Sequence, residues 1–178
     1  MTELSELIAR AEIGDVLARY AHAIDRGDRP LARTCYHDDA IDNHGRVNAS
    51  VDEVFAFFES YGATLRGTYH FMGAPLIVVG AEGDPDRALA ETYCLYRREL
   101  LDPAAEVLMQ GLRYFDVLER RDGAWRIAHR TVILDWEQRG AGVPSVTAPP
   151  SWTRGARREA DVASPITEHL AHAQGLRH

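Results

Sequence analysis

The sequence predicts an α+β fold in which two helices pack on the concave face of one curved antiparallel sheet. Apolar residues recur with a period near 3.6 over residues 4–25, which indicates an amphipathic helix. Ser50 and Glu53 have the spacing of a capping box, which predicts a second helix over residues 50–61. Helices followed by consecutive strands are typical of α+β proteins. The predicted strands cover roughly residues 68–79, 87–100, 106–120 and 124–137.

Turn signals mark the ends of several elements. Arg26-Gly27-Asp28 ends the first helix, and Asp28 can cap a short helix that carries Pro30 in its first turn. Residues 36–47 are dense in His and Asp, and we expect a short strand or loop there. Asp122-Gly123 lies between two strand-like runs and predicts a β-hairpin.

The chain divides into one domain and a tail. Residues 1–138 hold all the predicted helices and strands, and this length suffices for one sizeable core. Residues 139–178 are rich in Gly, Pro, Ser and Ala, so we expect an extended tail. Because a large apolar side chain usually packs against something, we expect Trp152 to act as a partial lid over a pocket or to contact a partner subunit.

The composition excludes several classes of function. The net charge of −7 argues against nucleic-acid binding, and the basic stretch 154–158 is expected to be solvated tail. All 20 basic residues are Arg, which excludes a lysine Schiff base and a phosphate-binding loop. The lone Cys35 and Cys94 argue against redox or zinc–thiolate chemistry. No segment resembles a membrane span, and the acidic start does not resemble a signal peptide, so we expect a cytoplasmic protein.

Polar residues within apolar segments are the candidate site residues. Asp25 closes the first helix shortly after Tyr20. For a lone Asp, a solvent-facing helix end is the ordinary interpretation. Strand alternation places His70 on one face with Met72, although an imidazole on an apolar face is often a hydrogen-bonded core residue.

Arg130 lies in the last predicted strand. Because a buried arginine is costly unless it is paired, we expect a carboxylate or a bound anion beside it. His129 is expected on the opposite face with Ile127 and Ile133. The residues expected on the same face as Arg130 are Ala128, Val132, Leu134 and Trp136.

The cluster His37-Asp38-Asp39-Ala40-Ile41-Asp42-Asn43-His44 raises the question of a metal site. Asp42 and His44 share a strand face and are a plausible pair of ligands. No third ligand occurs at the spacing of a metal-binding motif. The sequence therefore favours a polar pocket rim or turn, with no metal.

Four runs of sequence carry a family resemblance. They are Tyr20-x4-Asp25, Cys35-Tyr36-His37-Asp38-Asp39-Ala40, Thr68-Tyr69-His70-Phe71-Met72-Gly73 and the closing run over residues 113–130. Together they resemble the SnoaL-like branch of the nuclear-transport-factor-2-like superfamily over residues 4–137. The resemblance implies a cystatin-like α+β barrel, in which a curved sheet wraps around helices into a cone with one deep pocket.

Within that superfamily the chain most resembles the scytalone dehydratase, hexachlorocyclohexane dehydrochlorinase and bile-acid 7α-dehydratase group. In those enzymes a helix-end Asp orients a strand His that removes a proton beside the departing group. Asp25 and His70 fall on these two positions, while Tyr20 matches a pocket tyrosine and Arg130 falls near a pocket arginine. These four residues are the expected catalytic residues. The expected substrate-binding residues are Met72, Tyr96, Leu134, Trp136 and Phe58.

The resemblance and the chemistry of the pair predict a cofactor-independent lyase. A neutral imidazole is the usual general base at pH 7, and a carboxylate on its other nitrogen fixes the tautomer. The expected reaction eliminates water or a halide from a small apolar cyclic substrate, with neither cofactor nor metal. The alternatives are a double-bond isomerase, a polyketide-type cyclase, or a non-catalytic ligand-binding or assembly subunit. Relatives with this fold also lead us to expect a homodimer or homotrimer.

Overall fold

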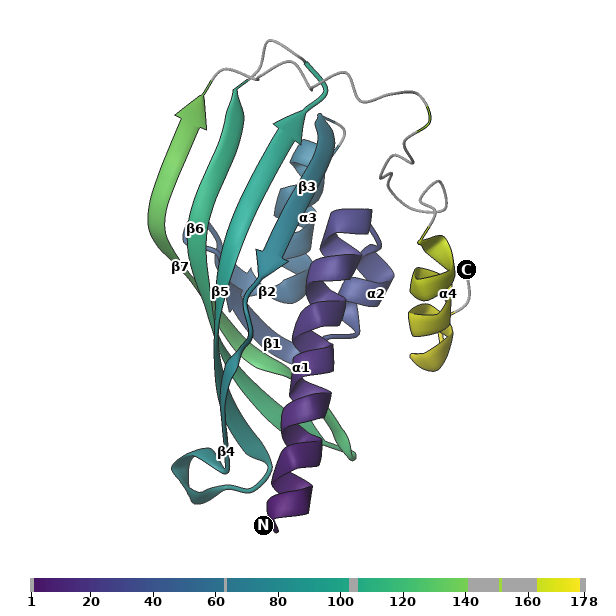
Figure 1. Cartoon of the computed structure of the whole chain (residues 1–178), viewed down its shortest axis with the longest axis vertical. Coiled ribbons are helices and arrows are strands. Elements are labelled where there is room, and N and C mark those ends of the chain that lie inside the picture. Colours follow the sequence, from purple (N-terminus) through teal and green to yellow (C-terminus); the bar gives the residue numbers. More distant parts are fainter. Residues whose placement is uncertain (1, 63, 103–105, 141–150, 152–162, 177–178) are drawn as a thin grey trace.

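The computed structural model describes residues 2–62, 64–102, 106–140, 151 and 163–176. The strands are β1 (Tyr36–Asn43), β2 (Asn48–Ser50), β3 (Leu65–Met72), β4 (Leu76–Val79), β5 (Arg87–Leu100), β6 (Val107–Arg121) and β7 (Ala124–Gly140). The helices are α1 (Glu3–Arg26), α2 (Arg29–Arg33), α3 (Val51–Gly62) and α4 (Ser164–Ala173). The strands form one curved, unclosed sheet in the order β2-β1-β7-β6-β5-β3, with β4 paired to β5 (Figure 1). The predicted α+β fold is confirmed.

The predicted turn and cap residues begin and end the helices. Gly27 ends α1 in the left-handed region, with φ 71°. Asp28 accepts a hydrogen bond from the Leu31 backbone N–H at 3.0 Å and so caps α2. Ser50 and Glu53 exchange hydrogen bonds in front of α3, which confirms the capping box.

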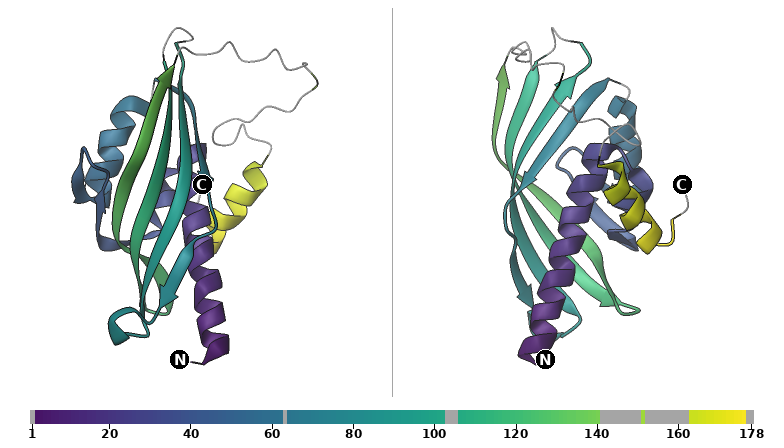
Figure 2. Two further views of the ribbon diagram at one scale, coloured as in Figure 1. Left: turned by 60° about the vertical axis from the view of Figure 1, so that its left-hand side comes forward. Right: turned by 45° about the vertical axis from the view of Figure 1, so that its right-hand side comes forward.

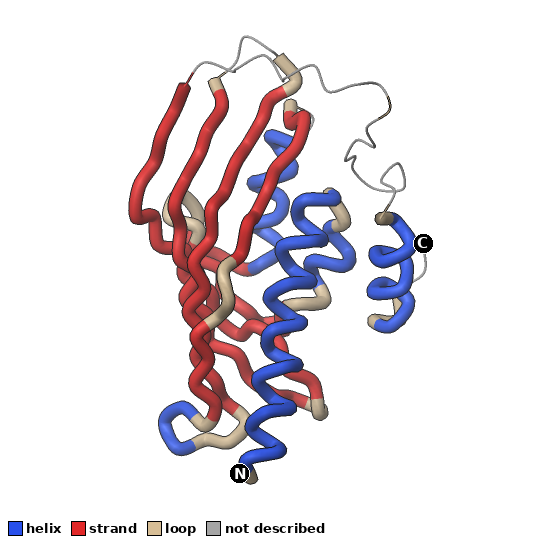
Figure 3. Tube along the Cα trace, in the orientation of Figure 1, coloured by secondary structure: helices blue, strands red, loops and turns tan. Residues whose placement is uncertain are grey.

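The extended segment predicted over residues 68–79 is two strands. β3 ends at Met72, and the chain leaves it over residues 73–75 before β4 begins, in the stretch drawn in tan in Figure 3. Pro75 has no N–H, so it cannot donate to a strand ladder. The single strand expected there is therefore corrected to a pair of strands, both of which pair with β5.

One strand pair departs from the antiparallel sheet that the sequence predicts. β1 runs parallel to β7 and places Asp42 opposite Arg130, whereas the other pairs among the described strands are antiparallel. A long connection through α3 and the five strands β2 to β6 separates β1 from β7 in the chain, so no hairpin imposes an antiparallel arrangement. The sheet is therefore mixed at this one position.

Two β-bulges in β7 decide which of its side chains face α1. The register between β6 and β7 shifts at Ala128 and again at Asp135. Each bulge inserts one residue and inverts the alternation of faces. Arg130 and Leu134 face the concave side of the sheet, on which α1 lies, and Trp136 faces the convex side. The expectation that Trp136 shares a face with Arg130 is therefore wrong, whereas Ala128, the residue inserted at the first bulge, has no pairing partner on β6.

The bulge at Ala128 also separates His129 from Ile127. Ile127 is fully buried opposite Leu118, whereas His129 lies opposite Val117. The expectation that His129 and Ile127 share a face is wrong for the same reason.

α1 runs along the concave side of the sheet, as two further views show (Figure 2). Its buried side chains include Ile13, Val16 and Leu17, spaced at three to four residues as a helix facing a core requires. Burying a side chain of this size stabilises the fold by about 1.5–3 kcal/mol. α3 packs against β1 and β2. None of the helices in the described part of the chain combines the length and apolar character that crossing a membrane demands.

The segment 139–178 is not wholly extended. α4 lies on the side of α1 away from the sheet, where His22 and Thr167 are hydrogen-bonded at 2.8 Å (Figure 2). Ala171 is fully buried, and Leu170 packs against the core. This apolar stripe gives α4 a surface on which to fold, so the expected extended tail is corrected for this stretch. Trp152, the expected lid residue, lies outside the described residues.

Candidate active site around Asp25 and His70

Asp25 and His70 are in direct contact, as the sequence predicts. Asp25 Oδ1 accepts a hydrogen bond from His70 Nδ1 at 2.7 Å, and Asp25 Oδ2 accepts one from the His70 backbone N–H at 2.8 Å. The two side chains are only 12% and 7% exposed. With Nδ1 bound to a carboxylate, Nε2 is the nitrogen that can accept a further proton. Among the residues that the structure describes, Nε2 has no hydrogen-bond partner.

The last turn of α1 and the middle of β3 bring this pair together. Thr68 lies two positions before His70 on the same face, and its Oγ1 donates to Asp25 Oδ1 at 2.9 Å. The His70 ring lies 4.8 Å, centroid to centroid, from the ring of Tyr96, directly opposite on β5. Both oxygens of the Asp25 carboxylate thus accept hydrogen bonds, and the His70 imidazole packs beside the Tyr96 ring. Both groups are held in one orientation.

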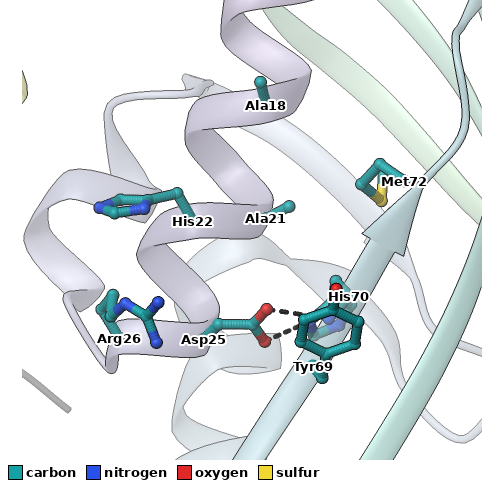
Figure 4. Close-up of a pocket in the computed structure, with 8 residues that line it drawn as sticks. All are labelled: Ala18, Ala21, His22, Asp25, Arg26, Tyr69, His70 and Met72. Carbon is teal, nitrogen blue, oxygen red and sulfur yellow. Dashed lines mark hydrogen bonds and ion pairs between the residues drawn. The ribbon is translucent and has the colours of Figure 1, made fainter. Parts of the chain in front are cut away.

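A pocket of about 290 Å³ opens beside this pair, between α1 and β3. In Figure 4, Asp25 reaches from the helix to His70 on the strand. This volume is at the small end of ligand pockets, which hold roughly 300–1,000 Å³. Of the expected substrate-binding residues, Met72 lines this pocket. The lining residues are Ala18, Ala21, His22, Asp25, Arg26, Tyr69, His70 and Met72.

Arg130 belongs to a buried network and not to an open site. It is fully buried, and its Nε and Nη2 donate to the two oxygens of Asp116 at 2.7 and 2.9 Å. Its guanidinium lies 4.1 Å from the ring centroid of Tyr20 and 4.4 Å from that of Tyr114. Burial alone would lower the pKa of Arg130, but the charge of Asp116 holds that pKa well above its ordinary value. Asp116 is thus the carboxylate partner expected for Arg130. The expected catalytic role of Arg130 is corrected, because the guanidinium is fully buried and no substrate can reach it.

Tyr20 is part of the same network. Its side chain is buried between Tyr36 and Tyr114, with ring centroids 5.8 and 6.1 Å away. Burial raises the pKa of Tyr20 above its usual range, and the Arg130 charge acts in the opposite direction. The expected catalytic role of Tyr20 is corrected, because its side chain is only 3% exposed.

The other expected substrate-binding residues divide between the two faces of the sheet. Tyr96 lies beside His70 on the concave face, and Leu134, opposite Leu112, lies on the same face. Leu134 is 54% exposed, and Phe58 of α3 is 43% exposed and packs against the His44 ring at 5.1 Å between centroids. His70, Tyr96, Leu112 and Leu134 all lie on the concave face of the sheet.

Trp136 does not lie on the concave face. It lies on the convex face opposite Gly111, where the indole fills the space that a Cβ at position 111 would need. The expected place of Trp136 in the pocket is wrong because the bulge at Asp135 turns its side chain to the other face.

A second Asp–His pair lies at the end of β1. His44 Nδ1 is hydrogen-bonded to Asp42 Oδ1 at 2.6 Å, and the Tyr36 hydroxyl donates to Asp42 Oδ2 at 2.8 Å. Arg130 Nη1 in turn donates to the Tyr36 hydroxyl at 3.2 Å. Burial is the largest influence on the pKa of Asp42 and raises it, but His44, Arg130 and Tyr36 together hold that pKa below its ordinary value. Asp42 is thus a buried carboxylate anion.

The rest of the His- and Asp-rich run has other partners. His37 Nε2 is hydrogen-bonded to the Glu119 carbonyl at 2.9 Å. Asp38 and Asp39 form ion pairs with Arg33 and Arg121. Within the described ranges, three or more His, Cys, Asp or Glu side chains nowhere converge as metal ligands would.

Both cysteines are buried and protonated. Burial raises the pKa of the Cys94 thiol to about 12, and it raises the pKa of Cys35 above its ordinary value. Because the thiolate is the nucleophile, neither side chain is suited to covalent catalysis.

Three features of the site escape the sequence analysis. Thr68 alternates with His70, so the strand pattern carried a signal for its role. The hydrogen bond between Asp42 and His44 follows the same alternation, but the sequence interpretation considered the two only as metal ligands or a polar rim. The Tyr36 hydroxyl that joins Asp42 to Arg130 has no signal in the sequence, because it depends on the parallel pairing of β1 with β7.

Comparisons with solved structures place the fold among known ones. A candidate scytalone dehydratase from Novosphingobium aromaticivorans superposes with a TM-score of 0.69 at 15% identity, covering 86% of this chain and 100% of that chain. The hexachlorocyclohexane dehydrochlorinase from Novosphingobium barchaimii gives 0.71 at 17% identity, covering 83% and 100%. A cystatin-like protein from Nostoc punctiforme gives 0.57 at 20% identity, covering 76% and 94%. At these identities the likeness shows the fold alone.

Sequence comparison reaches the same family. No curated protein matches the chain in its sequence. The model of the SnoaL-like domain matches residues 5–131, which include both Asp–His pairs and most of the sheet. The match covers more than half of the chain, and the protein therefore belongs to the SnoaL-like domain family.

Proposed function

We propose that this protein is a cofactor-independent lyase in which His70 removes a proton from a small apolar cyclic substrate. The observation that carries the proposal is the 2.7 Å hydrogen bond between His70 Nδ1 and Asp25, beside a pocket. The carboxylate fixes the tautomer and stabilises the imidazolium that forms when Nε2 takes a proton. General-base catalysis of this kind contributes roughly 10²–10⁴-fold to the rate.

The surroundings of the pair suit an elimination. Ala18, Ala21 and Met72 give the pocket apolar lining beside the pair, which favours an apolar substrate. Both cysteine thiols are buried and protonated, so the mechanism forms no covalent adduct with them. The bond broken is a C–H next to a carbon that bears a hydroxyl or a halogen. The solved relatives include a hexachlorocyclohexane dehydrochlorinase and a candidate scytalone dehydratase, which is consistent with this reaction class.

The test is a product screen without added cofactor. Hexachlorocyclohexane isomers and scytalone serve as the two probes, with chloride release and loss of water measured by ion chromatography and mass spectrometry. We expect release of chloride or water by the purified protein and a loss of at least about 100-fold in His70→Ala. A moved double bond with nothing released would favour the isomerase alternative. Tight binding of a probe without any turnover would favour a ligand-binding subunit, and a trapped covalent adduct would contradict the mechanism.

A further inference from the structure

The pocket between α1 and β3 has an apolar end and a polar end. Ala18 and Ala21 of α1 line the apolar end, and Met72 of β3 lies toward them in Figure 4. Asp25 and Arg26 line the other end, at the last turn of α1. Ala21 and Arg26 are five residues apart in this helix, which is about 7.5 Å along its axis. A six-membered ring with one small substituent therefore reaches from one end to the other.

Arg26 brings a fixed positive charge to the polar end. A guanidinium stays protonated throughout the pH range in which proteins are folded. A basic residue in the last turn of a helix interacts favourably with the helix dipole, and Arg26 lies in that turn. Its place in the pocket lining gives it a second role, because its charge acts on whatever the pocket holds. Within the described part of the chain it is the one arginine that lines this pocket, whereas Arg130 is fully buried.

The guanidinium of Arg26 has the donors that a carboxylate requires. A guanidinium carries five N–H groups in a planar fork, so it can bind a ligand in addition to partners within the protein. Two of these groups match the two oxygens of a carboxylate, and charge-assisted hydrogen bonds of this kind are roughly twice as strong as neutral ones. Arg26 is half-buried, so water and salt screen the interaction less than on an open surface. A carboxylate is therefore the ligand group that suits the polar end.

Asp25 favours a ligand that carries a single negative charge. Its two oxygens accept three hydrogen bonds, from Thr68 Oγ1, the His70 backbone N–H and His70 Nδ1, so the carboxylate is directed at β3. As an anion in the pocket lining it still repels a negative ligand, and this repulsion grows with the charge of the ligand. A carboxylate is therefore disfavoured less than a phosphate. When His70 takes a proton, the imidazolium offsets the added charge.

We propose that Arg26 binds a carboxylate on the substrate, so that the substrate is a small cyclic acid. The inference rests on the proposed function, because it assigns this pocket to the molecule from which His70 removes a proton. The apolar ring lies against Ala18, Ala21 and Met72, and the carboxylate pairs with Arg26. Arg26 is thus a specificity-determining residue, which favours acids over neutral rings of the same shape and holds the ring beside the base.

Two probes of nearly the same shape and different charge test the assignment. 4-Oxocyclohexanecarboxylate and 4-oxocyclohexanecarboxamide share one ring, and their binding at pH 7 is measured by isothermal titration calorimetry. The wild-type protein should bind the acid at least about tenfold more tightly than the amide. Arg26→Gln should bind the two probes with equal affinity. Arg29→Gln is the matched control and should keep the wild-type preference, because Arg29 pairs with Glu59 at 2.6 Å outside the pocket lining.

Proton exchange separates this inference from the proposed function. Both probes carry α-protons beside the ketone, and the exchange of these protons for deuterium in D₂O is followed by NMR. Arg26→Gln should raise the KM of the acid to that of the amide. His70→Gln should lower kcat for both probes by about 100-fold or more. His129→Gln, on the convex face, is the matched histidine control and should change neither value.

Each outcome decides one of the two claims. Equal affinity of the wild-type protein for the two probes, or a preference for the acid that Arg26→Gln retains, contradicts the carboxylate site and leaves His70 as base untouched. Full activity of His70→Gln, or no acceleration of exchange by the wild-type protein, contradicts the proposed function, while the binding preference still decides whether Arg26 holds a carboxylate. If Arg26→Gln fails to fold by circular dichroism, Arg26→Lys replaces it, and the loss of the paired donors should lower the preference severalfold. An unchanged preference in Arg26→Lys would overturn the assignment.

Discussion

Asp25 holds His70 at two atoms at once, with one carboxylate oxygen on the ring Nδ1 at 2.7 Å and the other on the backbone N–H at 2.8 Å. The backbone contact fixes where the carboxylate lies relative to β3, and the ring contact fixes the tautomer. The orientation of the imidazole therefore depends on the helix end and on the strand together.

Asp25→Asn should lower turnover by about 10²-fold or more while the fold is kept. The amide has nearly the same shape, but it cannot stabilise an imidazolium, and its NH₂ group favours the wrong tautomer of His70. Turnover of the active probe and the melting temperature are measured together. Thr68→Val, which removes one donor and keeps the charge, is the matched control and should have a smaller effect. Equal activity of Asp25→Asn and wild type would show that the carboxylate has no part in the reaction.

Arg130→Leu should destabilise the fold by about 3–5 kcal/mol, because it leaves Asp116 buried without its partner. The double variant Arg130→Leu with Asp116→Leu should recover part of that loss, since no unpaired charge remains. Urea unfolding measures both. A single variant as stable as wild type would contradict the view of Arg130 as a buried structural cation.

The stabilisation of the fold by ionised Asp42 should be lost in acid. Its pKa is lowered in the folded protein, so its contribution to stability is present above the unfolded pKa of about 3.9 and is lost as the pH falls below that value. The melting temperatures of wild type and Asp42→Asn, measured from pH 6 down to about pH 3, should therefore converge at the acid end. A difference between the two proteins that grows toward low pH would contradict the sign of the shift.

Trp136 should contribute to self-association and not to ligand binding. It lies on the convex face, in a row of paired residues with Phe71, Leu95 and Gly111. The side chains of Phe71, Leu95 and Trp136 are all exposed. Adjacent exposed apolar side chains of this kind mark interaction surfaces. We expect a homodimer or homotrimer by light scattering and a shift toward monomer in Trp136→Glu. Leu134→Glu, on the concave face, is the control; a shift toward monomer in that variant alone would contradict the assignment.

The fold and the first Asp–His pair could be predicted because both depend on local patterns. Helix periodicity, the caps at Asp28 and Ser50, and the turn at Asp122-Gly123 each act within a few residues of sequence. The pairing of Asp25 with His70 could be predicted only from the family resemblance. The sequence pattern alone fits a solvent-facing helix end at Asp25 and a hydrogen-bonded core histidine at His70 just as well.

The place of Arg130 relative to its neighbours could not be predicted in the same way. Counting outward from the Asp122-Gly123 turn places Asp116 opposite His129, but the bulge at Ala128 moves it opposite Arg130. A single inserted residue moves the side chains that follow it to the other face of the sheet, and no residue type in this stretch predicts such a bulge. The second bulge moves Trp136 out of the pocket for the same reason. The contact between Tyr36 and Arg130 depends on strands that are far apart in the chain.

Proton removal by His70 can be measured without knowledge of the leaving group. Cyclohexanone is incubated with the protein in D₂O, and exchange of its α-protons for deuterium is followed by NMR. The account predicts exchange faster than in buffer with wild type and with His129→Gln, and a fall of about 100-fold or more in His70→Ala. Exchange in His70→Ala as fast as in wild type would contradict the central claim that His70 is the base.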